Sequence, residues 1–190
     1  TGTWPNVIVP PPHTQNPNYR LPCRVSESYG SGLAHNKTVT ITSWPMPNLV
    51  FKFGSMAAAK SLELLVTCFQ YEAAGKRPCL IKPAVDTRQP GLIWSRVPGM
   101  ERKADLEIRE GDLLSPNLAQ EFDVLLVDES HWLSKELVDQ LYALSTQIPV
   151  VCYGLRTDFQ QRLFPGSAAL FALADEIVEI QGLCRFCHEP

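Results

Sequence analysis

The chain lacks a long apolar segment. Although 45% of its 190 residues are apolar, no run approaches the roughly 20 residues that a membrane-spanning helix needs. The chain also lacks an excess of charge, since its formal net charge of −3 gives no general attraction to nucleic acid. Its six cysteines are too scattered for a disulfide scaffold. We therefore expect one compact domain with no membrane-spanning segment and no nucleic-acid partner.

Proline is unevenly distributed, and residues 1–47 hold eight of the sixteen. Proline fixes φ and lacks an N–H donor, so this stretch excludes a sustained helix or an inner strand. Trp4, Tyr19 and Trp44 are costly to leave in water. We predict a proline-rich extended arm that buries these side chains on its own domain or on another protein subunit; a flexible tail is the alternative. The chain begins with Thr1 and not Met, from which we expect a removed leader or a fragment.

From residue 48 the sequence alternates between strand and helix patterns. Apolar runs predict strands that end at Phe53, Lys82, Val127 and Tyr153, and weaker strand patterns cover 104–108 and 176–180. Helical periodicity covers 60–74, 134–146 and 161–173. This alternation is typical of an α/β fold with a mainly parallel sheet flanked by helices. Ligands of such sheets bind at the carboxyl ends of the strands.

One segment, "GSMAAAKS" (54–61), follows the first of these strands and opens the first helix. It matches the phosphate-binding pattern G-x-x-x-x-G-K-[ST] at Gly54, Lys60 and Ser61 but has Ala59 in place of the second glycine. In that motif, backbone N–H groups and a helix N-terminus surround the phosphates, while the lysine and the hydroxyl serve phosphate and Mg²⁺. The strand–loop–helix context predicts a P-loop domain over residues 48–181.

A pair of carboxylates, Asp128 and Glu129, ends the apolar run "VLLV". A carboxylate at the end of a strand beside a phosphate loop typically orients Mg²⁺ or its water. A second carboxylate next to it can act as a general base toward an attacking hydroxyl. The alternative is an exposed acidic pair at the start of the next helix, where negative charge is favourable.

Four segments carry a family resemblance: "GSMAAAKS", "IKPAVDTR", "VLLVDESHWL" and "IPVVCYGLRTDFQQRLFPGSAALFALADEIVEI". They resemble the tetrameric, zinc-containing thymidine kinases of the cellular and bacterial type. The resemblance runs from about residue 48 to residue 187. It implies a domain that moves the γ-phosphoryl group of ATP to the 5′-hydroxyl of thymidine.

The resemblance also implies roles for individual residues. The residues implied to bind nucleotide and Mg²⁺ are Gly54, Lys60, Ser61, Asp86 and Asp128. The residues implied to act in catalysis are Glu129, as the base that takes the 5′-hydroxyl proton, and Arg88. Asp86 and Arg88 together match the D-x-R motif that the family has near the phosphates. The thymine ring would pack on Met56, Trp132 and Phe159. The alternatives are that Met56 and Phe159 are core residues and that Arg88 is a surface cation. Ser95-Arg96 resembles a segment of some bacterial members.

Two departures from the family pattern concern the site. Ala59 replaces a glycine that lets the backbone approach phosphate, and the strain alone is expected to cost about 1–3 kcal/mol. Because alanine favours helices, we predict that the helix begins within Ala57–Ala59 and closes the loop. Lys60 would then pair with Asp128 or Glu129. The usual D-E-x-Q-[FY] of the family becomes "DESHW" (128–132), which puts a histidine in place of an amide and enlarges the aromatic residue.

The family carries a zinc-bound second lobe whose loop covers the base. Cys184 and Cys187 match the first pair of zinc ligands of that lobe. Because the sequence ends at Pro190, before the second pair, we interpret residues 182–190 as a truncated remnant of the zinc lobe. A structural zinc site needs four ligands, so the alternatives are two free thiols or a site that recruits Cys23.

These departures favour a former thymidine kinase that serves as a non-catalytic accessory subunit without a bound cofactor. By analogy with other reused enzymes, we expect a mitochondrial assembly such as respiratory complex I or the mitoribosome, contacted through the N-terminal arm. The first alternative is an active, cytoplasmic, homotetrameric kinase that uses MgATP. The second alternative is a regulator that binds nucleotide without turnover.

Overall fold

The computed structural model of the chain describes residues 23–29, 37–43, 48–182 and 187. The chain divides into two compact units, residues 1–46 and residues 47–190, and each is described by itself. No helix within the described residues is long and apolar enough to cross a membrane.

The first unit contains a two-stranded antiparallel sheet. Strand β1 (Cys23–Tyr29) pairs with β2 (Lys37–Ser43), and the register runs from Cys23 opposite Ser43 to Tyr29 opposite Lys37. The prediction of an extended arm did not include this pairing. The β-branched alternation of "TVTITS" (38–43) was the available signal for it. Trp4, Tyr19 and Trp44 lie outside the described residues, so the docking of the arm stays a prediction.

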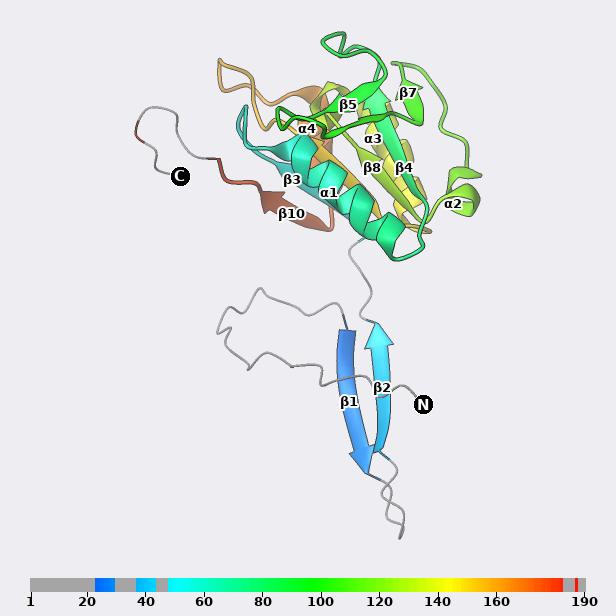
Figure 1. The fold of residues 1–190 in the computed structure, drawn as a ribbon. Helices are drawn as coiled ribbons and strands as arrows, with labels where there is room; N and C mark the ends of the chain where they lie inside the picture. The colour runs from blue at the N-terminus through cyan, green and yellow to red at the C-terminus, as the bar shows by residue number, and fades with distance from the viewer. Residues whose placement is uncertain (1–22, 30–36, 44–47, 183–186, 188–190) are drawn as a thin grey trace. The chain divides into compact units, whose positions relative to one another are not determined.

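The second unit is built on a parallel six-stranded sheet (Figure 1). In spatial order the strands are β10 (Glu176–Glu179), β3 (Leu49–Phe53), β9 (Val150–Gly154), β8 (Val124–Val127), β4 (Pro78–Pro83) and β7 (Leu106–Ile108). Every neighbouring pair is parallel. The predicted α/β fold is confirmed. Strands β3 and β8 end at the predicted residues, and β4 and β9 each end one residue later than predicted.

Helices cover both faces of this sheet. Helix α1 (Lys60–Ala73) buries Leu64, Leu65 and Cys68 against one face. Helices α3 (Lys135–Ser145) and α4 (Pro165–Leu173) pack on the other face. Alternate strand residues supply the two cores: Leu49 and Phe51 of β3 face α3 and α4, and Val50 faces α1.

Several shorter elements were not predicted. Strands β5 (Leu92–Trp94) and β6 (Glu101–Lys103) form an antiparallel hairpin, α2 covers Leu118–Glu121, and the 3₁₀ turn η1 covers Ser130–Trp132. Elements of three or four residues are too short for a hydrophobic period to be visible. Helix α4 begins at Pro165, four residues later than predicted, because proline suits the first helical position and cannot donate a helix hydrogen bond.

Because all six strands run in the same direction, the segments that follow β3, β4, β8 and β9 leave the sheet at one edge. Gly54, Asp86, Asp128 and Leu155 all come from these segments. Three of the sequence-predicted site residues, Gly54, Asp86 and Asp128, therefore lie at the edge where parallel sheets bind ligands.

Candidate functional site

The phosphate loop, residues 54–61, joins β3 to α1. Gly54 is required by close packing, because a Cβ at this position would lie 2.5 Å from the Ile180 carbonyl oxygen. Ala57 and Ala59 both adopt left-handed backbone conformations, with φ of 70° and 59°. Between them, Ala58 is buried and its N–H donates to the Ser55 carbonyl oxygen at 3.2 Å. Alternating left-handed residues of this kind turn successive N–H groups toward a concave, anion-binding loop.

The prediction that the alanines extend the helix is wrong. Ala59 is the N-cap of α1, and helical geometry begins only at Lys60. A left-handed residue cannot continue a right-handed helix, and each costs an L-residue about 1–2 kcal/mol. The tertiary contacts of the loop therefore override the helix propensity of alanine. The open loop shape survives the loss of the second glycine, and the free N–H groups of the first turn of α1 are available to an anion.

The predicted pairing of Lys60 with Asp128 or Glu129 is also wrong. The Lys60 ammonium donates to the carbonyl oxygens of Ser55 at 2.7 Å and Gly54 at 3.2 Å, so it lies across its own loop. Burial lowers the pKa of Lys60, and the nearby Glu129 and Asp128 charges partly oppose that shift. A bound phosphate would offer this ammonium charged oxygens in place of the two neutral carbonyls.

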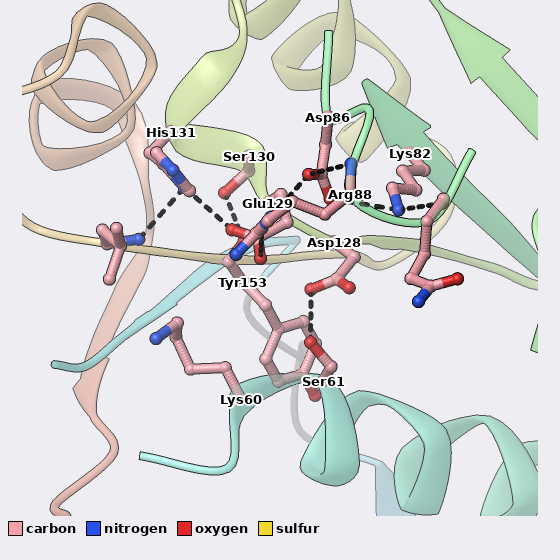
Figure 2. A network of polar contacts seen from close by, with 12 residues as sticks. Lys60, Ser61, Lys82, Asp86, Arg88, Asp128, Glu129, Ser130, His131 and Tyr153 are labelled. Carbon is pink, nitrogen blue, oxygen red and sulfur yellow. Dashed lines mark hydrogen bonds and ion pairs between the residues drawn. The ribbon is translucent and has the colours of Figure 1, made fainter. Parts of the chain in front are cut away.

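Ser61 and Asp128 form the second part of the site (Figure 2). The Ser61 hydroxyl donates to Oδ1 of Asp128 at 3.2 Å. Asp128 is almost completely buried, and burial together with the adjacent Glu129 charge raises its pKa to about 6. A hydroxyl and one carboxylate beside a phosphate loop fit Mg²⁺, which usually binds through one or two carboxylates plus the phosphates of a substrate.

Four side chains form the third part, which we name the ion-pair chain: Lys82, Asp86, Arg88 and Glu129. The Lys82 ammonium lies 3.0 Å from Oδ2 of Asp86, and Oδ1 of Asp86 accepts a hydrogen bond from Nε of Arg88 at 2.7 Å. Nη2 of Arg88 donates to Oε1 of Glu129 at 2.5 Å. Figure 2 shows the contacts leading from β4 across to the end of β8. Burial alone would raise the pKa of Asp86, but hydrogen bonds from Arg88 and Lys82 outweigh it and lower that pKa.

His131, which stands where the family resemblance expects an amide, is 1% exposed. Its Nδ1 accepts the Leu155 N–H at 3.3 Å, and burial lowers its pKa to about 4. The ring is therefore neutral at pH 7, with its proton on Nε2. The 3.4 Å approach of Nδ1 to Glu129 is consequently not an ion pair, and Arg88 is the cation that holds Glu129.

These parts surround a cleft of about 620 Å³, a size common among small-molecule sites. Among the predicted substrate residues, Met56 and Trp132 line the cleft, and so do Ser95 and Arg96. Trp132 is held by aromatic contacts, with its ring centroid 5.0 Å from that of His131 and 5.3 Å from that of Phe164.

Phe159 does not join them. Its side chain is 92% exposed and does not line the cleft, so the structure places it neither in the cleft nor, as the alternative had it, in the core. Met56, at 71% exposure, is not a core residue either. Lys82 and Trp94 also line the cleft, and both are among the lining residues that were missed from the sequence. The available signal for Lys82 was a cation at the end of a buried strand, where it needs partners.

The zinc interpretation stays a prediction. Cys184 lies outside the described residues, and Cys187 is an exposed thiol. Among the residues that the structure describes, no group of three or more His, Cys, Asp or Glu side chains could hold a metal ion.

Comparison with known proteins identifies relatives over the second unit. The family model for thymidine kinase matches residues 47–190. A thymidine kinase of Streptococcus agalactiae is 38% identical over 149 residues, which cover 76% of this chain and 78% of that protein. A thymidine kinase of Legionella pneumophila is 40% identical over 150 residues, which cover 74% of this chain and 70% of the relative.

Solved structures give a more distant likeness. The crystal structure of Pif1 helicase from Candida albicans aligns with 72% of this chain and 36% of its own at 14% identity and a TM-score of 0.41. A likeness of this size carries no functional argument.

Proposed function

The chain belongs to the thymidine kinase family, and on that premise we propose that it transfers the γ-phosphoryl group of ATP to the 5′-hydroxyl of thymidine. The observation that carries the proposal is the open phosphate loop, in which Ala59 keeps the left-handed conformation that glycine usually supplies. The altered loop was one of the arguments for an inactive protein, and the left-handed conformation of Ala59 weakens that argument. The alternative of an active kinase therefore has better support than the accessory subunit.

Nucleotide binding is assigned to the phosphate loop. The free N–H groups at the start of α1 and the Lys60 ammonium would bind the β- and γ-phosphates. Ser61 and Asp128 would hold Mg²⁺, which neutralises charge on the phosphates when bound. The 3.2 Å contact between these two side chains supports this role, because it brings two oxygen ligands together at the foot of the loop.

Catalysis is assigned to two members of the ion-pair chain, Arg88 and Glu129. The Glu129 carboxylate would take the proton of the 5′-hydroxyl as that oxygen attacks the γ-phosphorus. The Arg88 guanidinium would stabilise negative charge on the transferred group, and its other contacts fix its position. Met56 and Trp132, which line the same cleft, would contact the thymine ring.

The test is the formation of thymidine monophosphate from thymidine and MgATP by the purified chain. We expect turnover that needs both substrates and that falls by about 10²–10⁴-fold in Glu129→Gln, the range typical of a lost general base. Glu101→Gln is the matched control, because Glu101 is exposed on β6 and should leave turnover unchanged. Absence of thymidine monophosphate from the folded, unmodified chain would refute the proposal.

The remaining hypotheses are separated by the same experiment. Binding of MgATP without turnover would favour the nucleotide-binding regulator. Absence of both MgATP binding and turnover would favour the non-catalytic accessory subunit. Attachment of the arm to a larger assembly, a mitochondrial location and a homotetramer stay predictions.

A further inference from the structure

Lys82 is an unusual cleft residue because it is a lysine that is 3% exposed. It is the fifth residue of β4. The two residues before it, Leu80 and Ile81, are buried in the cores on the two faces of the sheet. Lysine is almost never fully buried unless its charge has partners. Its presence at this position therefore requires an explanation.

All three hydrogens of the ammonium have acceptors. Lys82 donates to the carbonyl oxygens of Gln89 at 2.7 Å and Leu92 at 2.8 Å, and it lies 3.0 Å from Oδ2 of Asp86. Asp86 and Gln89 lie in the segment between β4 and β5, and Leu92 is the first residue of β5. One ammonium thus ties two points of that segment and the start of β5 to the edge of the sheet.

The segment carries Arg88, whose own side chain is 63% exposed. An exposed arginine loses considerable conformational entropy when it is fixed in one geometry. Arg88 is nevertheless fixed, because Asp86 accepts from its Nε and Glu129 from its Nη2. Asp86 can hold Arg88 only if Asp86 itself is immobile and ionised, and Lys82 is the buried cation that contacts it.

From this geometry we propose that Lys82 is a positioning residue, which fixes Asp86 and through it the reactive arrangement of Arg88 and Glu129. The inference rests on the proposed kinase activity. Lys82 does not touch the substrates in this role. Stability alone is a weak explanation, because buried ion pairs are often replaced by apolar residues without loss of stability.

The first test is a double-mutant cycle on turnover with Lys82→Met and Arg88→Met. We expect Lys82→Met to lower kcat by about 10–100-fold, the usual loss for a residue that orients a functional side chain, with KM for ATP little changed. In the Arg88→Met background the same change should add about twofold or less, because the group that Lys82 positions is already gone. Lys76→Met, in an exposed lysine 3.7 Å from Asp123, is the control and should leave kcat unchanged.

The second test does not depend on activity. The Arg88 Nε–H donates to Asp86 and should give a resolved NMR signal, assigned by its loss in Arg88→Lys. We expect the signal to broaden or disappear in Lys82→Met and to persist in Lys76→Met. If the unmodified chain makes no thymidine monophosphate, the proposed function fails and this signal alone decides the inference.

Three results would overturn the inference: unchanged kcat in Lys82→Met, an equal loss in both backgrounds, or an unchanged Arg88 signal. If Lys82→Met does not fold, Lys82→Met/Asp86→Asn removes both buried charges and leaves no unpaired carboxylate. We expect that variant to fold with the same loss of the Arg88 signal. Retention of the signal there would equally contradict the role of Lys82.

Discussion

The phosphate loop and the ion-pair chain line the same cleft. They differ in that the loop depends on the polypeptide backbone and the ion-pair chain depends on side chains. The loop is made from backbone conformation, with small side chains at Ala57, Ala58 and Ala59. The ion-pair chain is made from four charged side chains that contact one another. A substitution at one of these alanines therefore changes function only as far as it changes φ and ψ. A substitution in the ion-pair chain removes the functional group itself.

The largest effect should come from the ion-pair chain. Arg88→Met removes the charge that would face the transferred phosphoryl group, and catalytic arginines of phosphoryl transfer contribute about 10³–10⁵ in kcat. We expect a loss of kcat near the lower end of this range, since Lys60 and Mg²⁺ remain. Affinity for MgATP, measured by calorimetry, should change little. A kcat within tenfold of the unmodified chain would show that Arg88 is only a surface cation.

Asp128→Asn should show how much the buried Asp128 carboxylate lowers the stability of the apoprotein. Burial raises the pKa of Asp128 from 3.8 to about 6, so the folded protein keeps this proton over a pH range where the unfolded chain loses it. The stabilising contribution is present at pH 4 and is lost as the pH rises through 6. Removal of the ionisable group should therefore stabilise the apoprotein at pH 7 by about 3 kcal/mol, from 1.36 kcal/mol per pKa unit.

Thermal unfolding at several pH values checks this expectation. The melting temperature of Asp128→Asn should exceed that of the unmodified chain by several degrees at pH 7, and the two should converge near pH 4. Glu101→Gln should follow the unmodified chain throughout. An Asp128→Asn variant that melts lower at pH 7 would mean that the carboxylate stabilises the apoprotein.

Lys60→Met tests the one charged side chain of the phosphate loop. Hydrogen bonds to charged groups contribute about 1.5–3 kcal/mol each, so we expect MgATP affinity to fall by about 10–150-fold. Lys103→Met, in an exposed lysine of β6, is the calorimetric control. Equal affinity in Lys60→Met and the unmodified chain would mean that the loop does not bind the phosphates.

Ala59→Gly should have a smaller effect. The informative result is whether the substitution raises or lowers the free energy of unfolding. Glycine relieves left-handed strain of about 1–2 kcal/mol but adds about 0.4–1 kcal/mol of chain entropy to the unfolded state. We expect stability to be equal or up to about 1.6 kcal/mol higher and MgATP affinity to rise less than tenfold. Ala143→Gly, at an exposed position inside α3, should instead lose about 1 kcal/mol. Equal losses in both variants, seen in urea unfolding, would contradict the left-handed conformation of Ala59.

Phe159→Ala should have the smallest effect. Its side chain is outside the cleft, so KM for thymidine should stay within about twofold, the scatter expected for distant sites. Trp132→Ala, which removes a cleft-lining ring, should raise that KM clearly more. The reverse order of the two variants would mean that the segment carrying Phe159 closes on the base.

The strands and the motif residues of the site could be predicted from the sequence, but the conformation of the phosphate loop could not. The apolar strands and the positions of Gly54, Lys60, Ser61, Asp128 and Glu129 follow from periodicity and motif spacing, since parallel strands bring their carboxyl ends together. The conformation of Ala59 does not follow, because local propensity favours a helix and tertiary contacts decide against it.

The contacts of Lys82 could not be predicted either. Two of its acceptors are main-chain carbonyls of Gln89 and Leu92, and any residue type could supply them. The prediction that Phe159 contacts the thymine ring failed for a related reason. Hydrophobic periodicity does not determine the path of a long connection such as the one between β9 and α4.

The proposed function requires that the phosphate loop bind nucleotide with alanine at position 59. Titration of the unmodified chain with MgATP in a calorimeter measures this binding. We expect saturable binding at one site with a Kd below about 1 mM, the upper end of usual KM values, and a matching rise in melting temperature. No heat of binding and no thermal shift at millimolar MgATP, with Ala59→Gly restoring both, would contradict it.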